Sequence, residues 1–357
     1  MEFGMQFFPN VGPKEKSAQQ YFDESLRLCE LADAYGYSHI RTVEHYFEPY
    51  GGYSPNPHIF LTAASQRTRK ARMVTGAVLP AFNNPLKIAG EIGMLDAISN
   101  GRLECGFARA FLPHEFERFG VSLDESVERF DEGLEQVRRL LEEENVTATG
   151  KYHSFRDVTS LPRPTQKPRP KFWTAAFGTP ASFEKAGRAG QWIMAIPIGG
   201  AAMGELLGIY REAWKSAGHP GKGRVMLAIH MFCDQDRKRA MDIAREPVER
   251  YFGGLVESAR GWMKGSSTKS YPNYDKLIAQ LAKETLESQM EKSAAWVGTP
   301  KELVAQIAAY EKETGGFEDA SLQVNFTSIS YEDADRSVRL FGEQVIPHFS
   351  GKRAAAE

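Results

Sequence analysis

The sequence predicts an α/β fold, a TIM-type (β/α)8 barrel with insertions in its C-terminal half. Eight short apolar runs of strand character alternate with helical patterns along the chain. Such alternation is typical of a parallel sheet, and eight units indicate closure into a barrel. An open doubly wound sheet is the alternative, but no GxGxxG motif follows the first strand. We treat residues 1–357 as one domain, because barrels with insertions reach this length.

The individual elements follow from local patterns. The expected strands are residues 2–8, 38–43, 71–79, 102–107, 171–176, 192–196, 224–233 and 320–326. The expected helices are residues 18–35, 58–67, 85–98, 123–144, 181–189, 203–217, 300–314 and 331–343. In the first helix Tyr21, Leu28 and Leu31 recur at helical spacing, and Gly36 follows as a stop signal. The proline-broken segment 147–170 indicates an extended excursion or hairpin.

A long insertion interrupts the alternation at about residues 235–292. It contains helical patterns around a polar, glycine-bearing stretch at 264–269. A connection of this length is unusual within a compact domain. Two interpretations stay open, a lid over a functional site and an ordinary surface insertion.

Composition narrows the class of partner. The formal net charge of −2 gives no reason to expect binding to nucleic acid or to a membrane surface, so a small-molecule partner is favoured. Three separated cysteines form no CxxC pair, and the histidines show no metal-ligand spacing, so no metal site is expected. No signal peptide begins the chain, and no apolar run approaches the ~18 residues that span a bilayer. These observations predict a cytoplasmic protein.

The dipeptide Glu44-His45 stands where the second strand ends and a loop begins. In an α/β barrel the catalytic groups gather at the carboxyl ends of the strands. The charge of histidine changes nearest neutral pH, so a neighbouring acid can tune it. Glu44 is expected to orient His45 or a nearby backbone group, although a solvated loop acid is an equally simple interpretation.

An ordered series of motifs accompanies this pair. The motifs are Glu44-His45, Leu79-Pro80 with Asn84-Pro85, Asn100-Gly101-Arg102, Gly106-Phe107-Ala108-Arg109, Glu128-Arg129-Phe130, Gly178-Thr179-Pro180-Ala181-Ser182 and Trp296-Val297-Gly298-Thr299-Pro300. With this series the chain resembles the bacterial luciferase-like, flavin-dependent monooxygenases over nearly its whole length. The resemblance implies an enzyme that uses externally reduced FMN and O2 to oxygenate a small organic substrate through a flavin C4a-(hydro)peroxide. It also implies a separate NAD(P)H:flavin reductase and a homodimer built on the helices that follow the early strands.

The resemblance assigns roles to particular residues. His45 and Glu44 would be catalytic, with His45 at the reactive edge of the flavin, where it acts as acid or base. The Gly76-Ala77 step matches a non-proline cis peptide that supports the flavin ring in the family, although small residues here also ease packing. The flavin phosphate would be held by Arg109, Arg129, Gly178, Thr179 and Ser182. Gly178-Thr179-Pro180 is at the same time an ordinary helix entry, and Arg129 an ordinary ion-pair partner.

Aromatic side chains are expected to line the substrate pocket and exclude water. The candidates are Tyr46, Phe47, Phe111, Phe7 and Trp173. For His114-Glu115 we favour a structural role. Tyr46 replaces a second histidine found in many light-emitting members, which favours an oxygenase over a light emitter.

Two other functions stay open. One is a deazaflavin (F420)-dependent oxidoreductase of the same fold, which transfers hydride. The other is a non-catalytic flavin-binding subunit, which the presence of His45, Arg109 and Arg129 disfavours.

Overall fold

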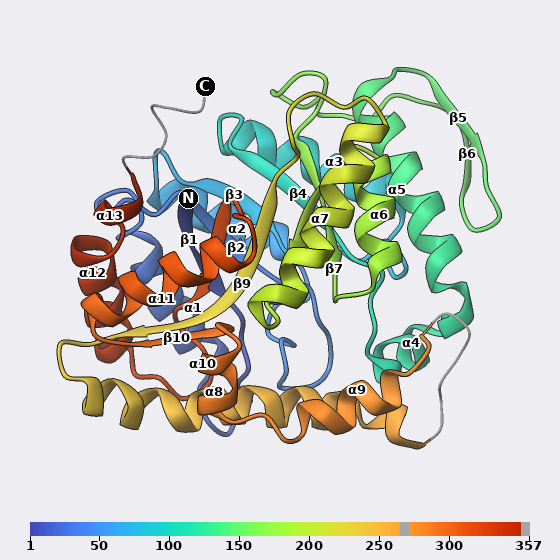
Figure 1. Ribbon diagram of the computed structural model, residues 1–357. Coiled ribbons are helices and arrows are strands. Elements are labelled where there is room, and N and C mark those ends of the chain that lie inside the picture. Colours follow the sequence, from blue (N-terminus) through green and yellow to red (C-terminus); the bar gives the residue numbers. More distant parts are fainter. Residues whose placement is uncertain (265–270, 351–357) are drawn as a thin grey trace.

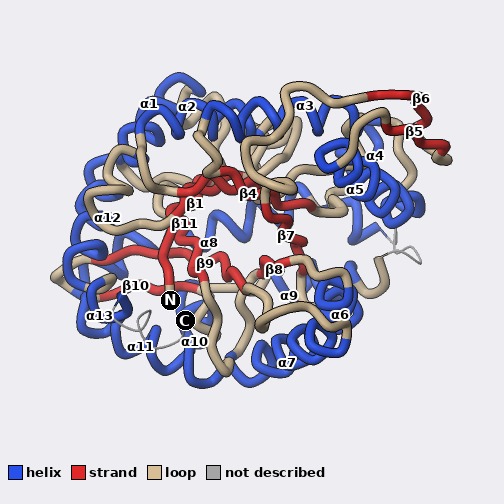
Figure 2. The backbone as a smooth tube through the Cα atoms, turned by 90° about the horizontal axis from the view of Figure 1, so that it is seen from above, coloured by secondary structure: helices blue, strands red, loops and turns tan. Residues whose placement is uncertain are grey.

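A closed ring of parallel strands forms the centre of the computed structural model, which describes residues 1–264 and 271–350. The ring runs in the order β1-β2-β3-β4-β7-β8-β9-β11 and closes through the pairing of β11 with β1. Figure 2 looks along the ring and shows helices surrounding it. Its strands are β1 (Glu2–Phe7), β2 (His39–Thr42), β3 (Arg72–Thr75), β4 (Leu103–Phe107), β7 (Lys171–Ala176), β8 (Trp192–Ala195), β9 (Val225–Cys233) and β11 (Asp319–Gln323). The predicted barrel is confirmed.

The helices agree with the predicted ones in place and differ mainly at their ends. The larger ones are α1 (Ala18–Cys29), α2 (Pro57–Arg67), α3 (Pro85–Ile98), α5 (Ser126–Glu142), α6 (Pro180–Arg188), α7 (Gly200–Ser216), α11 (Pro300–Glu313) and α12 (Tyr331–Gln344). Helix α1 ends at Cys29, earlier than its apolar pattern indicated, because residues 30–36 continue as turns. Helix α4 (Pro113–Phe119) was not predicted. A short η1 (Leu123–Glu125) and a terminal α13 (Pro347–Ser350) complete this set.

Three further strands lie outside the ring. β5 (Val146–Thr149) and β6 (Ser154–Val158) pair antiparallel, so the proline-broken excursion is a hairpin. β10 (Ala295–Gly298) was treated as a motif only, yet it pairs in parallel with the last residues of β9. The long β9 therefore extends past its barrel neighbours and carries β10 beside its carboxyl end.

The insertion lies across the carboxyl ends of the barrel strands. It comprises α8 (Arg237–Ser258), η2 (Arg260–Lys264), α9 (Tyr274–Leu281) and α10 (Leu286–Glu291). Figure 1 shows α8 running along the end of the barrel opposite the N-terminus, with α9 beside it. Residues 265–269 of the predicted glycine-bearing stretch lie outside the described residues, and the lid stays a prediction.

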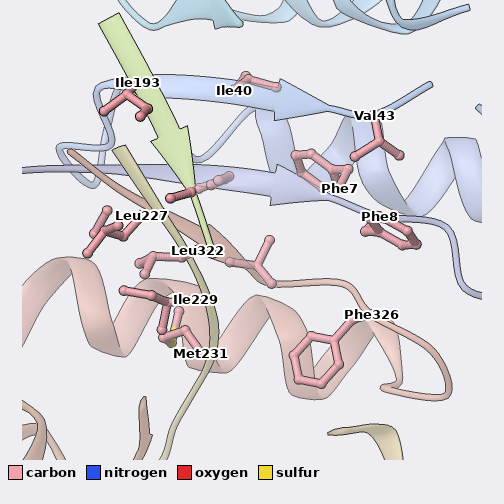
Figure 3. Packing of buried hydrophobic residues seen from close by; sticks show 14 of the residues in the cluster. Phe7, Phe8, Ile40, Val43, Ile193, Leu227, Ile229, Met231, Leu322 and Phe326 are labelled. Atoms are coloured by element: carbon pink, nitrogen blue, oxygen red, sulfur yellow. The ribbon is translucent and has the colours of Figure 1, made fainter. Parts of the chain in front are cut away.

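The core has two parts, one outside and one inside the ring. Outward-facing side chains pack between strands and helices, as Figure 3 shows for Ile229, Met231 and Leu322 beside a helix. Inside the ring Trp173, Met194 and Met226 form a small buried cluster with Val74. This inner cluster fills the barrel below its carboxyl end, so any cavity must lie above it.

Candidate active site

A cavity of about 680 Å³ opens at the carboxyl ends of the barrel strands, under the insertion. Several predicted site residues line it, namely Glu44, His45, Gly76, Ala77, Arg109, Phe111, Thr179 and Ser182. The insertion contributes Tyr251, Phe252 and Leu255 from α8 and Tyr274 from α9. A cavity walled by aromatic side chains with a few polar groups is the usual form of a small-molecule site.

Hydrogen bonds fix the chain after β2, where the Glu44-His45 pair stands. Thr42 Oγ1 donates to the Phe7 carbonyl at 2.9 Å, and Ser54 Oγ donates to the Val43 carbonyl at 2.7 Å. The His45 amide donates to the Ser54 carbonyl at 3.1 Å. The backbone is thus held on both sides, and His45 is placed at the cavity wall rather than in a free loop.

The acid that contacts His45 is Glu115, not its neighbour Glu44. Glu115 Oε1 lies 3.1 Å from His45 Nδ1 and accepts the Tyr46 amide at 2.9 Å. Glu115 is fully buried on α4. A buried carboxylate at one ring nitrogen fixes the orientation of an imidazole and leaves Nε2 for chemistry. This contact gives Glu115 a position beside His45, and the structural role that we favoured for it stays a prediction; His114 contacts the carbonyls of Tyr46 and Ser258.

Glu44 has a different environment. Its carboxyl group accepts hydrogen bonds from the Tyr46 hydroxyl at 2.5 Å, the Asn83 amide at 2.7 Å and the Leu79 backbone at 3.1 Å. Burial raises the pKa of Glu44 from 4.5 to about 8 and outweighs these three donors, which lower it. Of the two roles expected for Glu44, the contact with a neighbouring backbone group is the one observed.

The Gly76–Ala77 peptide bond is cis, as its match to the family motif implied. It lies beneath a buried arginine that the sequence did not single out. Arg41 Nη2 donates to the Gly76 carbonyl at 3.0 Å, and Nη1 donates to Gln6 Oε1 at 2.6 Å. The side chain of Arg41 lines the cavity and burial lowers its pKa to about 10. An arginine within a strand gives no sequence signal that it faces the barrel interior, and only the ring closure decides this.

The cavity wall formed by β4, β7 and α6 suits a phosphate group. Arg109 follows β4, and its guanidinium stands 4.1 Å from the centroid of the Tyr271 ring. No carboxylate in the described part of the chain pairs with it. Thr179 is the N-cap residue of α6; its side chain makes no cap hydrogen bond to the helix backbone, and its hydroxyl lies 2.7 Å from that of Ser182 in the first turn. A guanidinium without a carboxylate partner and two hydroxyls at a helix N-terminus line the same cavity, and such a set suits the phosphate of a flavin mononucleotide.

Four predicted site residues do not line this cavity. Arg129 pairs with Glu125 at 2.9 Å and lies over the Tyr152 ring, the ordinary ion-pair arrangement. Gly178 has a φ of 131°, which favours glycine, and precedes the cap of α6.

Tyr46 and Phe47 stand beside the cavity in an aromatic cluster with Phe119. The roles of all four residues stay predictions.

Two of the proposed pocket aromatics are buried in the core instead. Phe7 packs against Phe60, and Trp173 fills the barrel interior, where its indole nitrogen donates to Glu104 Oε2 at 2.9 Å. Of the predicted aromatic residues, Phe111 lines the cavity, with its ring centroid 6.2 Å from that of His45.

Comparison with known proteins agrees with this arrangement. The sequence profile of the luciferase-like monooxygenases matches residues 1–316. The chain belongs to this family. Its relatives include the oxygenase component of a flavin-dependent trigonelline monooxygenase from Acinetobacter baylyi, 29% identical over 94% of this chain and 92% of the relative. An F420-dependent glucose-6-phosphate dehydrogenase from Amycolatopsis mediterranei is 26% identical over 93% of this chain and 96% of its own length.

Solved structures of this luciferase-like family share the fold over almost the full chain. Monooxygenase RslO1 from Streptomyces bottropensis is 43% identical, with a TM-score of 0.86 and coverage of 98% of this chain and 100% of that protein. The oxygenating constituent of 3,6-diketocamphane monooxygenase from Pseudomonas putida, in complex with FMN, is 23% identical. Its TM-score is 0.80, and the match covers 97% of this chain and 98% of that protein. At this level of identity the match establishes a shared fold and nothing more. The present luciferase-like protein is thus an oxidoreductase related to flavin-dependent monooxygenases.

Among the described residues, no helix is long and apolar enough to cross a membrane. Over the same part of the chain, no group of three or more histidine, cysteine or acidic side chains is placed to hold a metal ion.

Proposed function

We propose that this protein is the oxygenase component of a two-component monooxygenase that uses reduced FMN and O2 to oxygenate a small organic substrate. The contact between Glu115 and His45 carries the proposal, because it orients an imidazole toward a cavity with a wall that suits a phosphate group. We call this wall, which carries Arg109, Thr179 and Ser182, the phosphate wall. One oxygen atom would enter the substrate and the other would leave as water. The relative named as an oxygenase component supports a separate NAD(P)H:flavin reductase as the source of reduced FMN.

The residues of this chain would have three roles in the proposed reaction, namely FMN binding, proton transfer and exclusion of water. Arg109, Thr179 and Ser182 would hold the FMN phosphate, and bound FMN supplies the electrons that activate O2. His45, oriented by Glu115, would exchange a proton at Nε2 with the reacting oxygen. The aromatic wall formed by Phe111 and the insertion would keep bulk water from the reaction.

The deazaflavin alternative remains because F420-dependent relatives share the fold and a similar level of identity. The two functions differ in the cofactor bound and in the use of O2. The third candidate, a non-catalytic flavin-binding subunit, is disfavoured because His45 has a buried orienting acid.

The deciding experiment mixes the protein with photoreduced FMN and air-saturated buffer in a stopped-flow instrument. We expect oxidised FMN to appear several-fold more slowly than it does from free reduced FMN, and His45→Ala to abolish the delay. A parallel titration compares FMN and F420 by fluorescence. Free-flavin kinetics with wild-type protein, or binding of F420 in preference to FMN, would contradict the proposal.

We propose further that the protein is a cytoplasmic homodimer. Its three cysteines are free and buried, which suits a reducing compartment. Helices α2 and α3 follow the early strands and carry the exposed apolar side chains of Ile59 and Met94, which are 71% and 58% accessible. An apolar face of this kind favours a second copy of the chain as its partner.

A further inference from the structure

A row of polar side chains crosses the cavity floor on four neighbouring strands. Strand register places Arg41 of β2 beside Gln6 of β1, Gln6 beside Gln323 of β11, and Gln323 beside His230 of β9. All four side chains line the cavity and are at most 7% exposed. Barrel interiors at such positions are ordinarily filled by branched apolar residues. We call this row the polar arc, and its presence at the floor needs a chemical reason.

The arc holds a positive charge that has no acidic partner in the described part of the chain. Arg41 donates to neutral groups, the side chain of Gln6, the carbonyl of Gly76 and the sulfur of Met194. Asp319, an acid near the other end of the barrel, is instead engaged by Arg72 and Arg224. A buried charge with only neutral partners is unfavourable, so an anion at the floor would be strongly attracted.

Further polar atoms of the arc are unpaired. Arg41 Nε, Gln323 Oε1 and His230 Nε2 have no hydrogen-bond partner although each is buried. The backbone amide of His230 donates to the Ala294 carbonyl at 3.2 Å, and burial lowers the pKa of the ring to about 3, so the imidazole is neutral. The arc therefore offers one charged donor group, the Gln323 side-chain oxygen as an acceptor, and a neutral imidazole nitrogen that donates or accepts according to its tautomer. This set complements an anionic oxygen with a hydroxyl or N–H group close by.

The arc lies across the barrel from the phosphate wall. Arg109 and Thr179 follow β4 and β7, whereas the arc is centred on β1 and β11, three to four strands away around the ring. A flavin held by its phosphate at the first wall therefore does not place that phosphate on Arg41. Negative charge on the ring of a reduced flavin is a competing occupant, and the experiment below separates it.

An aromatic path joins the arc to His45. The ring centroids of His230 and Tyr251 are 4.5 Å apart, those of Tyr251 and Phe8 are 5.1 Å apart, and those of Phe8 and His45 are 5.7 Å apart. A flat, unsaturated molecule can lie along this path with one end on the arc and the other near His45.

We propose that the polar arc is the specificity subsite of this enzyme and binds the anionic oxygen, carboxylate or ionised phenol, of an aromatic or extended unsaturated substrate. The inference rests on the proposed function for the identity of the reaction, but the binding subsite is testable without turnover. Arg41 is the residue that determines the preference for an acid, Gln323 accepts a hydrogen bond from the neighbouring donor, and the neutral His230 lies beside it.

Binding of matched anionic and neutral probes tests the subsite. Calorimetric titration of the full-length protein, saturated with FMN so that the phosphate wall is filled, compares benzoate with benzamide, and 4-nitrophenolate with nitrobenzene. We expect at least one anion to bind tenfold or more tightly than its neutral partner. The pair that shows the preference tells a carboxylate substrate from a phenolate one. Equal affinities within both pairs in wild-type protein would overturn the inference, whatever the variants do.

Two variants test whether Arg41 causes the preference for an anionic probe over its neutral partner. Arg41→Gln should abolish it, and Arg41→Lys, which keeps the charge, should retain part of it. Arg188→Gln is the matched control and should leave the preference unchanged, because Arg188 is an exposed ion-pair partner of Glu184 and does not line the cavity. Loss of the preference in Arg109→Gln but not in Arg41→Gln would place the anion on the phosphate wall, against the inference. Tenfold weaker binding of reduced FMN to Arg41→Gln, with the anion preference intact, would assign the arc to the flavin ring instead. If FMN fails to bind while the anion preference persists, the proposed function fails and the subsite stands.

Discussion

The guanidinium of Arg41 lies directly across Gly76. Nη2 donates to the Gly76 carbonyl at 3.0 Å, and a Cβ atom at position 76 would stand 1.9 Å from Nε. The sequence left two reasons for a small residue at this step, support of a flavin ring and easier packing. The structure adds a third, because no side chain at position 76 is compatible with Arg41 in its place.

Gly76→Ala should therefore displace Arg41 and destabilise the protein. Forcing an extra methyl group into a packed site typically costs about 1–3 kcal/mol of unfolding free energy. Gly208→Ala is the matched control, since a Cβ at this exposed position in α7 meets nothing within 4 Å. There we expect a neutral or slightly stabilising effect. Urea unfolding of both variants measures the difference, and equal stability would show that Arg41 moves aside without cost.

The contact between Glu115 and His45 predicts that substitutions of these two residues lower the rate of oxygenation by different amounts. Removing a general acid or base typically lowers a rate by about 10²–10⁴-fold, which we expect for His45→Gln. Glu115→Gln keeps an acceptor for the Tyr46 amide but removes the charge, so its loss should be smaller. The measurements are the rate of substrate oxygenation and the fraction of consumed O2 that is released as hydrogen peroxide, with FMN, a flavin reductase and an acidic substrate identified by the binding screen. If the Glu115→Gln enzyme releases no larger fraction of the consumed O2 as hydrogen peroxide than wild type does, the carboxylate does not orient His45.

The buried Glu44 predicts a pH dependence of stability. Burial raises the pKa of Glu44 from 4.5 to about 8, so the native protein keeps a proton that the unfolded chain loses as pH rises through 4.5. More protons are then bound in the native state, and the free energy of unfolding falls as pH rises from about 4.5 to 8. The loss is at most about 5 kcal/mol, at about 1.4 kcal/mol per unit of pKa. Below pH 4.5 the contribution is fully present.

Comparison with Glu44→Gln isolates this effect, because glutamine does not titrate in this window. The stability of wild type relative to the variant, from urea unfolding at a series of pH values, should decrease between pH 5 and 8 and then become level. A constant difference across this window would mean that the three donors around Glu44 hold it ionised.

Arg109 is predicted to bind the flavin through its phosphate. A hydrogen bond to a charged group contributes about 1.5–3 kcal/mol, so Arg109→Gln should weaken FMN binding by roughly 10- to 150-fold. Riboflavin, which lacks the phosphate, should bind wild type and variant alike. Fluorescence titration measures both ligands.

The same titration decides the role of Arg129, which the structure pairs with Glu125. A selective loss of FMN affinity in Arg129→Gln would make it a phosphate ligand. An unchanged affinity would leave it as a helix ion pair.

The apolar face on α2 and α3 predicts that charged substitutions on it separate the dimer into monomers. Ile59→Glu and Met94→Glu should convert a dimer to a monomer, because a charge at the centre of an apolar contact is left without a partner. Analytical ultracentrifugation distinguishes the two states. Ala202→Glu, at an exposed position in α7 outside these helices, is the control. A wild-type monomer, or dimers in both variants, would contradict the proposed interface.

The sequence by itself determined the barrel, because strand and helix periodicities are local and the eight units repeat in order. It also determined that His45 follows β2, and that Arg109 and Thr179 end neighbouring strands, since the carboxyl ends of parallel strands share one face. The exact ends of α1 and the pairing of β10 were not predictable, because turns and a partner strand distant in sequence decide them.

Only the tertiary structure decided which acid meets His45 and which residues form the cavity floor. Glu115 is 70 positions from His45, and the polar arc joins β1, β2, β9 and β11, so both arise from closure of the ring. Adjacency in sequence suggested Glu44, but neighbouring residues near the end of a strand point in different directions, and Glu44 turns to Asn83 and Leu79 instead. The sequence placed the chemistry at one end of the barrel, and the packing of its strands and helices selected the partners.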